Sequence, residues 1–569
     1  MMSASRIGRS WDALRPELAA GVSVDPPLKA GAPWVIAVAE VPRARVGADF
    51  ARLAGLFDGR RSLREAVLAA GIAEDAAQAF GVVDTLAAAG MLRPASLDET
   101  DGTRGSEGAR RGIRRSWTRF RYRAPLTFQW VLVDPSSLAG VLARPFRIRG
   151  VVATSMAGVL ALLAIAAVSV TIHSAAILGA LAAPLPVDLF PALLLAIVST
   201  GCLHELSHAV TLATMGGRPT RMGIMLLYLM PAFFCDVTDG WRIGERWRRA
   251  AVALAGPALH LVLAAASFAL LLLVDSSAVR VFLILYGSAC TVAVVANLIP
   301  FLKLDGYLAL VAITDTPYLR ANAVEAARRA SARLLFGEAP RGDTEREPVA
   351  LVGFGMLCVL SPIVLFVWAA IRLQPVFLEM GPWMALTYLM LLVSFLTATA
   401  WRIARFIAKS LPARARIART AAGAGAVLVL VALALLAPVR VIVHAGYMVR
   451  DEGVFLVSTT ESVLRPVHRG DPVRLLSNGI VLRPGIGAAV VAGSGRDTEV
   501  ALAALVPVSG PSAAVAGWGI RLGDVESPGR LPSVGAAEVD TGRDLPAGAL
   551  LLELAVQQPL RAVFGERTP

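Results

Sequence analysis

Residues 199–217, STGCLHELSHAVTLATMGG, place two histidines and a glutamate in an otherwise apolar run. Positions four apart share one face of a helix, so His204 and His208 can reach the same metal ion, with Glu205 beside them. Imidazole nitrogens bind Zn²⁺ at about 2.0–2.1 Å, and a catalytic zinc site keeps a position open for water whose pKa falls to roughly 7. This H-E-x-x-H spacing predicts a zinc site in which Glu205 is the general base.

A chance match is the alternative explanation of this motif. Histidine accounts for only 6 of 569 residues, so an accidental H-E-x-x-H has a probability below about 1%. Ionisable groups inside a membrane span also cost about 2.5–3.5 kcal/mol each on insertion scales, so three of them need a compensating partner. We therefore interpret His204, Glu205 and His208 as a metal site.

A third protein ligand is expected, and the segment 297–310, NLIPFLKLDGYLAL, supplies a carboxylate. Asp305 follows the fourth apolar run, on the same side of the membrane as the histidines of the second. Pro300 breaks the helix before it, and Gly306 lets the backbone turn after it. Alone, Asp305 would be an ordinary acid near the membrane surface. Beside the histidine pair, we predict that it is a metal ligand.

The composition is that of an integral membrane protein, with 56% hydrophobic and 17% charged residues and a mean hydropathy of +0.64. About 20 apolar residues are enough to cross a bilayer. Runs of that length occupy 151–172, 188–213, 250–274, 279–302, 349–372, 382–402 and 420–440. We predict a multi-span α-helical protein with about seven spans in the cell (inner) membrane.

Basic residues predict the orientation, because short loops rich in Lys and Arg stay in the cytoplasm. Such residues cluster in 110–123, 214–249, 312–348 and the loop before the last run, and are absent from 173–187 and 373–381. Seven spans place every basic loop in the cytoplasm and both loops without Lys or Arg outside. The amino terminus is then cytoplasmic and the carboxyl-terminal region is outside. Since the net charge of +13 lies largely in these loops, we expect no nucleic acid partner.

Soluble regions flank the predicted membrane core of 149–443. After a tail over 1–32, residues 33–95 show one strand-like run and three helical runs, a pattern typical of a small winged-helix-like domain. Residues 96–148 are a basic linker and a juxtamembrane segment expected to lie against the membrane surface. The β-rich runs of 444–569 predict a compact extracytoplasmic all-β domain.

HELSH in a span, followed by N-x-x-P-x-x-x-x-D-G in the fourth span, resembles the site-2 protease family of intramembrane zinc metallopeptidases. The resemblance implies that His204, His208 and Asp305 bind zinc and that Glu205 activates water. It also implies that Asn297 helps to hold the substrate backbone.

Further motifs resemble a subgroup of that family. LFDGRRSLREAV and VVDTLAAAGML resemble PqqD-like domains, which bind leader peptides of ribosomally made, modified peptides. The tail ESVLRPVHRGDPVRLLSN is similar to the β-barrel and lipoyl-like half-motifs of HlyD-type membrane fusion proteins. With CDVTDGW, this order resembles the peptide zinc metalloproteases of bacteriocin-type peptide maturation. The resemblance implies a peptide or membrane-anchored substrate and a peptide exporter as partner.

Two features near the motif allow alternative interpretations. The stretch 222–234, MGIMLLYLMPAFF, is too short to span and is expected to re-enter the membrane or to form edge strands that hold a substrate in extended form. We interpret Asp236, which follows it, as a residue that contributes to substrate binding, and a turn residue is the alternative. His260, at the start of the third span, is either structural or a partner of a metal ligand.

Two classes of function remain. One is a zinc metalloendopeptidase that recognises a peptide through its amino-terminal domain and cuts it near the cytoplasmic face. The other is a non-catalytic, metal-stabilised accessory subunit of a peptide exporter that docks through its β-rich tail. The intact Glu205 and Asp305 favour the enzyme. A winged helix could bind DNA, but the basic residues cluster in the linker and not on its helices, which favours a peptide.

Overall fold

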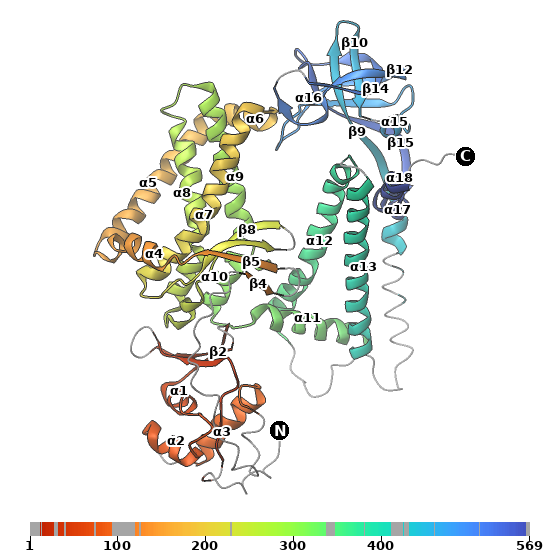
Figure 1. Cartoon of the computed structure of the whole chain (residues 1–569). Coiled ribbons are helices and arrows are strands. Elements are labelled where there is room, and N and C mark those ends of the chain that lie inside the picture. The colour runs from red at the N-terminus through yellow and green to blue at the C-terminus, as the bar shows by residue number, and fades with distance from the viewer. Residues whose placement is uncertain are drawn as a thin grey trace. The chain divides into compact units, whose positions relative to one another are not determined.

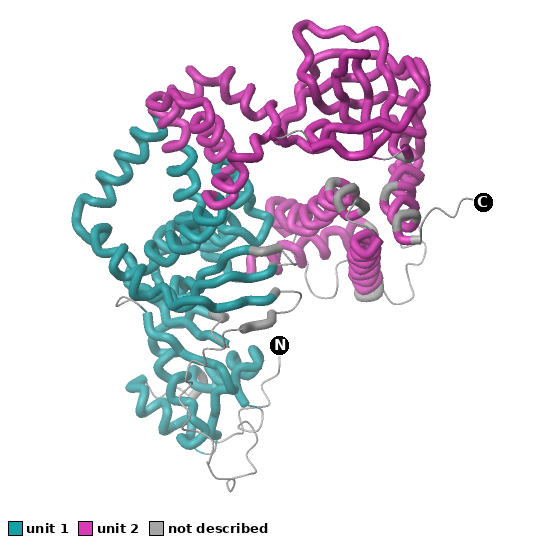
Figure 2. The backbone as a smooth tube through the Cα atoms, turned by 45° about the horizontal axis from the view of Figure 1, so that its top comes forward, with its two compact units in different colours: residues 1–164, 197–264, 290–317 teal, residues 165–196, 265–289, 318–569 magenta. Residues whose placement is uncertain are grey.

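The computed structural model describes most of the chain. Apart from isolated positions, the described residues are 14–27, 32–38, 41–72, 76–93, 120–123, 127–227, 230–336, 347–379, 382–410, 432–459, 461–510 and 513–564. They form two compact units (Figure 2). The first consists of residues 1–164, 197–264 and 290–317, and the second of 165–196, 265–289 and 318–569.

Within the described ranges, 6 helices are long and apolar enough to cross a membrane. They are α5 (Val151–Ile172), α7 (Phe190–Thr214), α8 (Arg246–Leu270), α9 (Ser277–Leu298), α12 (Val349–Glu379) and α13 (Pro382–Ser410). Each coincides with one of the first six apolar runs, because about 20 consecutive apolar residues can only satisfy their backbone groups in lipid as a helix. In the seventh predicted run, 420–440, the described residues 425, 429 and 432–436 are helical, whereas 438–440 already belong to the first strand of the carboxyl-terminal barrel. The seventh span stays a prediction.

The amino-terminal domain combines a three-stranded antiparallel sheet with three helices (Figure 1). Its elements are β1 (Val22–Asp25), β2 (Trp34–Val38), β3 (Val41–Val46), α1 (Ala48–Ala54), α2 (Leu63–Ala70) and α3 (Ala76–Ala88). Ser62 forms a capping box with Glu65 at the start of α2, and the helix ends at Gly71 with a φ of 64°. Leu53, Leu63 and other apolar side chains form the core between the helices.

A second antiparallel sheet belongs to the same unit as the H-E-x-x-H helix. Its strands, in the order β4-β5-β7-β8, are β4 (Phe120–Arg123), β5 (Thr127–Val133), β7 (Met222–Leu227) and β8 (Met230–Cys235). The described residues of this stretch, 222–227 and 230–234, therefore form strands, in agreement with the edge-strand alternative, and β8 lies at the edge of the sheet. β5, in the juxtamembrane segment, pairs with β7, and the expected position of this segment against the membrane surface stays a prediction. Gly223 permits this pairing, since a Cβ there would lie 2.0 Å from the carbonyl oxygen of Trp130.

The fourth span is followed by a break and a short helix. α9 ends at Leu298 and α10 (Asp305–Thr314) begins after six intervening residues, so Pro300 falls in the break as expected. A Cβ at Gly306 would lie 2.5 Å from the carbonyl oxygen of Leu298. Glycine is therefore needed at position 306 because α10 comes close to the end of α9. The sequence alone indicates a different reason for glycine here, namely to let the backbone turn.

The β-rich tail forms a closed six-stranded barrel in the order β10-β14-β12-β11-β15-β9. The strands are β9 (Pro438–Arg450), β10 (Gly453–Ser458), β11 (Pro472–Leu476), β12 (Gly485–Ala501), β14 (Ala514–Glu526) and β15 (Val534–Pro546). Buried side chains such as Tyr447, Leu456 and Leu475 fill it. A closed barrel leaves no exposed edge that could pair with other chains. The prediction of a β-rich region is confirmed.

Shorter elements connect these parts. They are α4 (Ser136–Ala143), α6 (Ser174–Ala182), β6 (Leu185–Pro186), α11 (Leu319–Phe336), α15 (Glu461–Leu464), α16 (Leu502–Leu505), β13 (Val508–Ser509), α17 (Ala547–Leu552) and α18 (Gln558–Phe564). β6 pairs in parallel with β13, which ties the segment before α7 to the barrel within the second unit.

Candidate metal centre

The two histidines of H-E-x-x-H lie one turn apart on the buried face of α7. His204 is 8% exposed and His208 is 5% exposed. Their Nε2 atoms are 3.2 Å apart. The i,i+4 spacing therefore brings both rings to one point, as the sequence predicts.

Asp305, the first residue of α10, reaches the same point. Its Oδ2 atom lies 3.0 Å from Nε2 of His204 and 3.6 Å from Nε2 of His208. Ligands at about 2.0–2.1 Å from a tetrahedral zinc ion are about 3.3 Å from one another. The three separations bracket that value. In the described part of the chain, these three residues are the group of side chains that could share one metal ion.

Hydrogen bonding favours a cation at this point. The Nδ1–H of His208 donates to the carbonyl oxygen of Val252 at 2.7 Å, so its Nε2 keeps a free lone pair. Asp305 Oδ2 is buried and has no well-aligned hydrogen bond, although His204 Nε2 lies nearby. Electron-rich atoms this close repel one another unless a positive charge lies between them. The donor set of two imidazoles and one carboxylate fits Zn²⁺.

The facing helix α8 makes room for the two rings at Gly256. A Cβ at this position would lie 2.3 Å from Nε2 of His204 and 2.6 Å from Nε2 of His208. Real Cβ atoms essentially never come so close to other heavy atoms, so only glycine fits here. Sequence reasoning missed Gly256, and the only signal was a glycine inside an apolar run.

Replacing Gly256 by alanine is expected to remove bound zinc, because the added methyl group occupies the space of both rings. Zinc bound to the detergent-purified protein should fall at least about tenfold, as for other disruptions of metal-site packing. The control is Gly158→Ala in α5, where a Cβ meets nothing within 4 Å. Full zinc content in Gly256→Ala would contradict the assignment.

Glu205 lies beside the three donors and contacts the edge strand. Its carboxylate accepts a hydrogen bond from the backbone N–H of Cys235, the last residue of β8. A Cβ at Gly201, one turn earlier on α7, would lie 3.0 Å from the ring of Phe233. β8 therefore packs directly on α7 next to Glu205.

The structure does not bring Asn297 and Asp236 into the group of donors. Asn297 donates from Nδ2 to the carbonyl oxygen of Ala293 in its own helix at 2.9 Å. Asp236 accepts a 2.5 Å hydrogen bond from the Thr238 hydroxyl and lies 3.3 Å from Arg221. Burial opposes ionisation of Asp236, but the Thr238 hydrogen bonds and the Arg221 charge outweigh it and lower the pKa of this carboxyl. These contacts agree with the alternative of a turn residue.

His260 lies next to a metal-site histidine. Its ring centroid is 5.1 Å from that of His204, and its Nδ1 is buried without a hydrogen-bond partner. The contact with His204 is between rings and not a hydrogen bond, so both alternatives for His260 stay open.

Comparison of the chain with protein-family models, curated proteins and solved structures gives no match. The chemistry therefore has to be argued from the geometry of the residues themselves.

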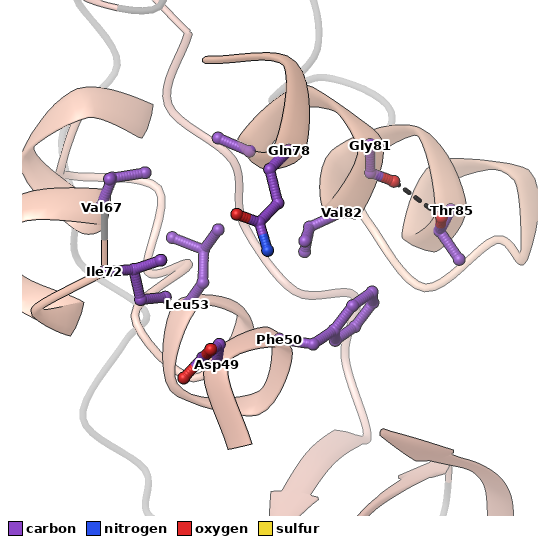
Figure 3. Close-up of a pocket in the computed structure, with 10 residues that line it drawn as sticks. Asp49, Phe50, Leu53, Val67, Ile72, Gln78, Gly81, Val82 and Thr85 are labelled. Atoms are coloured by element: carbon purple, nitrogen blue, oxygen red, sulfur yellow. Dashed lines mark hydrogen bonds between the residues drawn. The ribbon is translucent and has the colours of Figure 1, made fainter. Parts of the chain in front are cut away.

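The amino-terminal domain contains a cavity of about 360 Å³. Figure 3 shows it between α1, α3 and the end of α2, with the side chain of Gln78 directed into it. Its lining residues are Asp49, Phe50, Leu53, Val67, Ile72, Gln78, Ala79, Gly81, Val82 and Thr85. An apolar wall with a few polar groups is the usual character of a ligand pocket.

Proposed function

We propose that this membrane protein is a zinc metalloendopeptidase that cuts a peptide or membrane-anchored substrate. The observation that carries the proposal is the convergence of His204, His208 and Asp305 on one point with Glu205 beside it. Three protein ligands and one open position are typical of catalytic zinc. A purely structural zinc site would have a fourth protein ligand, and the described residues supply none.

The proposed reaction divides the chemistry between the metal and Glu205. Zinc, when bound, supplies Lewis-acid polarisation of the scissile carbonyl and lowers the pKa of water to about 7. Glu205 takes the proton from the attacking water and delivers it to the leaving amide nitrogen. The Cys235 N–H holds the Glu205 carboxylate in one orientation for both transfers.

The edge strand β8 suits a substrate in extended conformation. A strand at a sheet edge presents unpaired backbone groups, to which a peptide can add as a further strand. Because Cys235 ends β8 and contacts Glu205, a peptide added along β8 would pass close to the general base. This arrangement supports cleavage of an unwound substrate segment.

The substrate class follows from the amino-terminal domain. We propose that this domain binds a ribosomally made peptide, with an apolar side chain of the peptide in the cavity of Figure 3. The basic loops support a cytoplasmic position for this domain and cleavage near the cytoplasmic face. The β-barrel would then lie outside, where it could contact a peptide exporter.

The Gly81→Leu substitution should block the cavity while leaving the domain folded. A Cβ at Gly81 meets nothing within 4 Å, and leucine favours helix by about 0.8 kcal/mol over glycine. We expect at least tenfold weaker binding of a candidate leader peptide by fluorescence anisotropy, with an unchanged or higher melting temperature. Ala88→Leu, at an exposed position of α3 outside the lining, is the matched control. Equal binding by Gly81→Leu and wild type would place the peptide elsewhere.

The proposed function is tested by co-expressing a candidate peptide with the protein and measuring its cleavage by mass spectrometry. A peptide cut by wild type and left intact by Glu205→Gln supports the protease. If the protein binds zinc but Glu205→Gln processes the peptide as wild type does, the result would favour the accessory subunit of an exporter. Absence of zinc from the wild type would overturn both.

A further inference from the structure

The carboxyl end of α10 is held by two arginines from different parts of the first unit. Asp315 ends the helix with a φ of 52°. Its Oδ1 lies 2.8 Å from Nη1 of Arg45 and 2.5 Å from Nη2 of Arg249. Arg45 belongs to β3 of the amino-terminal domain and Arg249 to the first turn of α8. One carboxylate thus joins the amino-terminal domain to the membrane core.

Arg249 is a fixed part of this junction. It is 6% exposed. Its Nη1 donates to the carbonyl oxygens of Ile243 at 2.9 Å and Gly244 at 2.8 Å. Its Nη2 also donates to the carbonyl oxygen of Ala312 in α10 at 3.3 Å. A buried guanidinium with this many acceptors has one orientation, so it presents Asp315 to Arg45 in a defined position.

Arg45 makes further contacts with the core. Its Nη2 donates to the carbonyl oxygen of Trp241 at 3.2 Å, and its guanidinium lies 5.6 Å from the centre of the Trp241 ring. Nearby, Nε of Arg242 donates to the carbonyl oxygen of Pro26 at 2.5 Å. Trp241 and Arg242 belong to a 3₁₀ turn (Thr238–Arg242) that follows β8. The domain therefore docks on both α10 and the segment after the edge strand.

α10 connects this docking surface to the metal centre. Asp305 is its first residue and Asp315 its carboxyl-terminal cap. A helix of ten residues is about 15 Å long, its backbone hydrogen bonds keep its two ends at a fixed distance, and Gly306, Ala309 and Ala312 are buried along it. A shift at Asp315 must therefore move Asp305 relative to the histidines.

We infer that Arg45 and Asp315 are positioning residues through which the docked amino-terminal domain holds Asp305 at the metal centre. The inference rests on the proposed metal site and adds a role for the peptide-binding domain. Metal affinity depends on whether this domain is docked. A peptide that binds the domain and disturbs Arg45 would change the metal centre without contacting it.

The test is the zinc dissociation constant of full-length protein in detergent, measured by chelator competition. Arg45→Ala should weaken zinc binding about tenfold, which is the range for residues that orient a ligand. Arg61→Ala is the matched control, because it removes an arginine of the same domain whose side chain is 46% exposed and pairs with Asp58 of that domain. Arg45→Ala with the affinity of wild type would overturn the inference.

A second variant separates positioning from a merely structural role. In the Arg45→Ala and Asp315→Asn double-mutant cycle, the losses of zinc affinity should be less than additive, because both substitutions break the same contact. A structural role would lower the melting temperature of the single variants while leaving the zinc dissociation constant unchanged. If wild type binds no zinc, the proposed function fails; if wild type binds zinc and Arg45→Ala is indifferent, only this inference fails.

Discussion

Replacement of His204 by alanine is expected to eliminate stoichiometric zinc from the purified protein. His204 supplies one of three donors, and its Nε2 lies 3.0 Å from Asp305 Oδ2, nearer than Nε2 of His208 at 3.6 Å. Alanine leaves two protein ligands, which is too few for a tetrahedral zinc site. We expect at least a 100-fold loss of affinity, since removing a ligand costs more than the 10- to 100-fold loss typical of its supporting partners. The measurement is zinc per protein by inductively coupled plasma mass spectrometry.

His444→Ala is the matched control for this experiment. The His444 side chain belongs to strand β9 of the barrel, is 73% exposed and lies 3.6 Å from Glu538. Its removal should leave zinc content unchanged. Zinc retained at full stoichiometry by His204→Ala would show that the metal, if any, is held elsewhere, and it would remove the basis of the proposed protease.

The candidate metal centre is predictable from the sequence where local geometry determines the positions of its residues. His204 and His208 are four residues apart on one helix, so helical periodicity alone places them together. Asp305 is almost 100 positions away (305 minus 208 is 97), and it could be predicted only because alternating spans return the chain to the same side of the membrane. The helix break expected at Pro300 was the second sequence feature that indicated Asp305 as a ligand.

Contacts between segments that are far apart in the chain have no sequence pattern comparable to the i,i+4 spacing of the histidines. Gly256 is one glycine in an apolar helix, and the reason for it appears only when α8 packs on α7. The pairing of β5 with β7 joins segments about 95 residues apart, so the same alternating apolar residues could equally have covered a membrane surface. Arg45 and Asp315 are separated by 270 positions. Nothing local distinguishes either of them from an ordinary exposed charge.

In the amino-terminal domain, the three helices and the strand β2 were predictable, whereas β1, β3 and the cavity were not. The Ser62 cap and the Gly71 terminus are chemical signals carried by one or two residues. The cavity depends on the distance between α1 and α3, which is set by packing of the whole core. The helix propensities of individual residues carry no information about distances between helices.

Substitution of Glu205 by glutamine should abolish peptide cleavage while zinc remains bound. Glu205 is not among the three metal donors, and the glutamine amide oxygen can still accept the Cys235 N–H. Glutamine cannot take up a proton, however, and loss of a general base lowers rates by about 10²- to 10⁴-fold. The measurement is the rate of substrate cleavage by mass spectrometry, together with zinc content of the same preparation. Glu245→Gln, at a side chain that is 59% exposed and pairs with Arg248, is the control. Cleavage by Glu205→Gln at the wild-type rate would exclude this residue as the base, whereas loss of both zinc and cleavage would mean that Glu205 supports the metal site instead of the proton transfer.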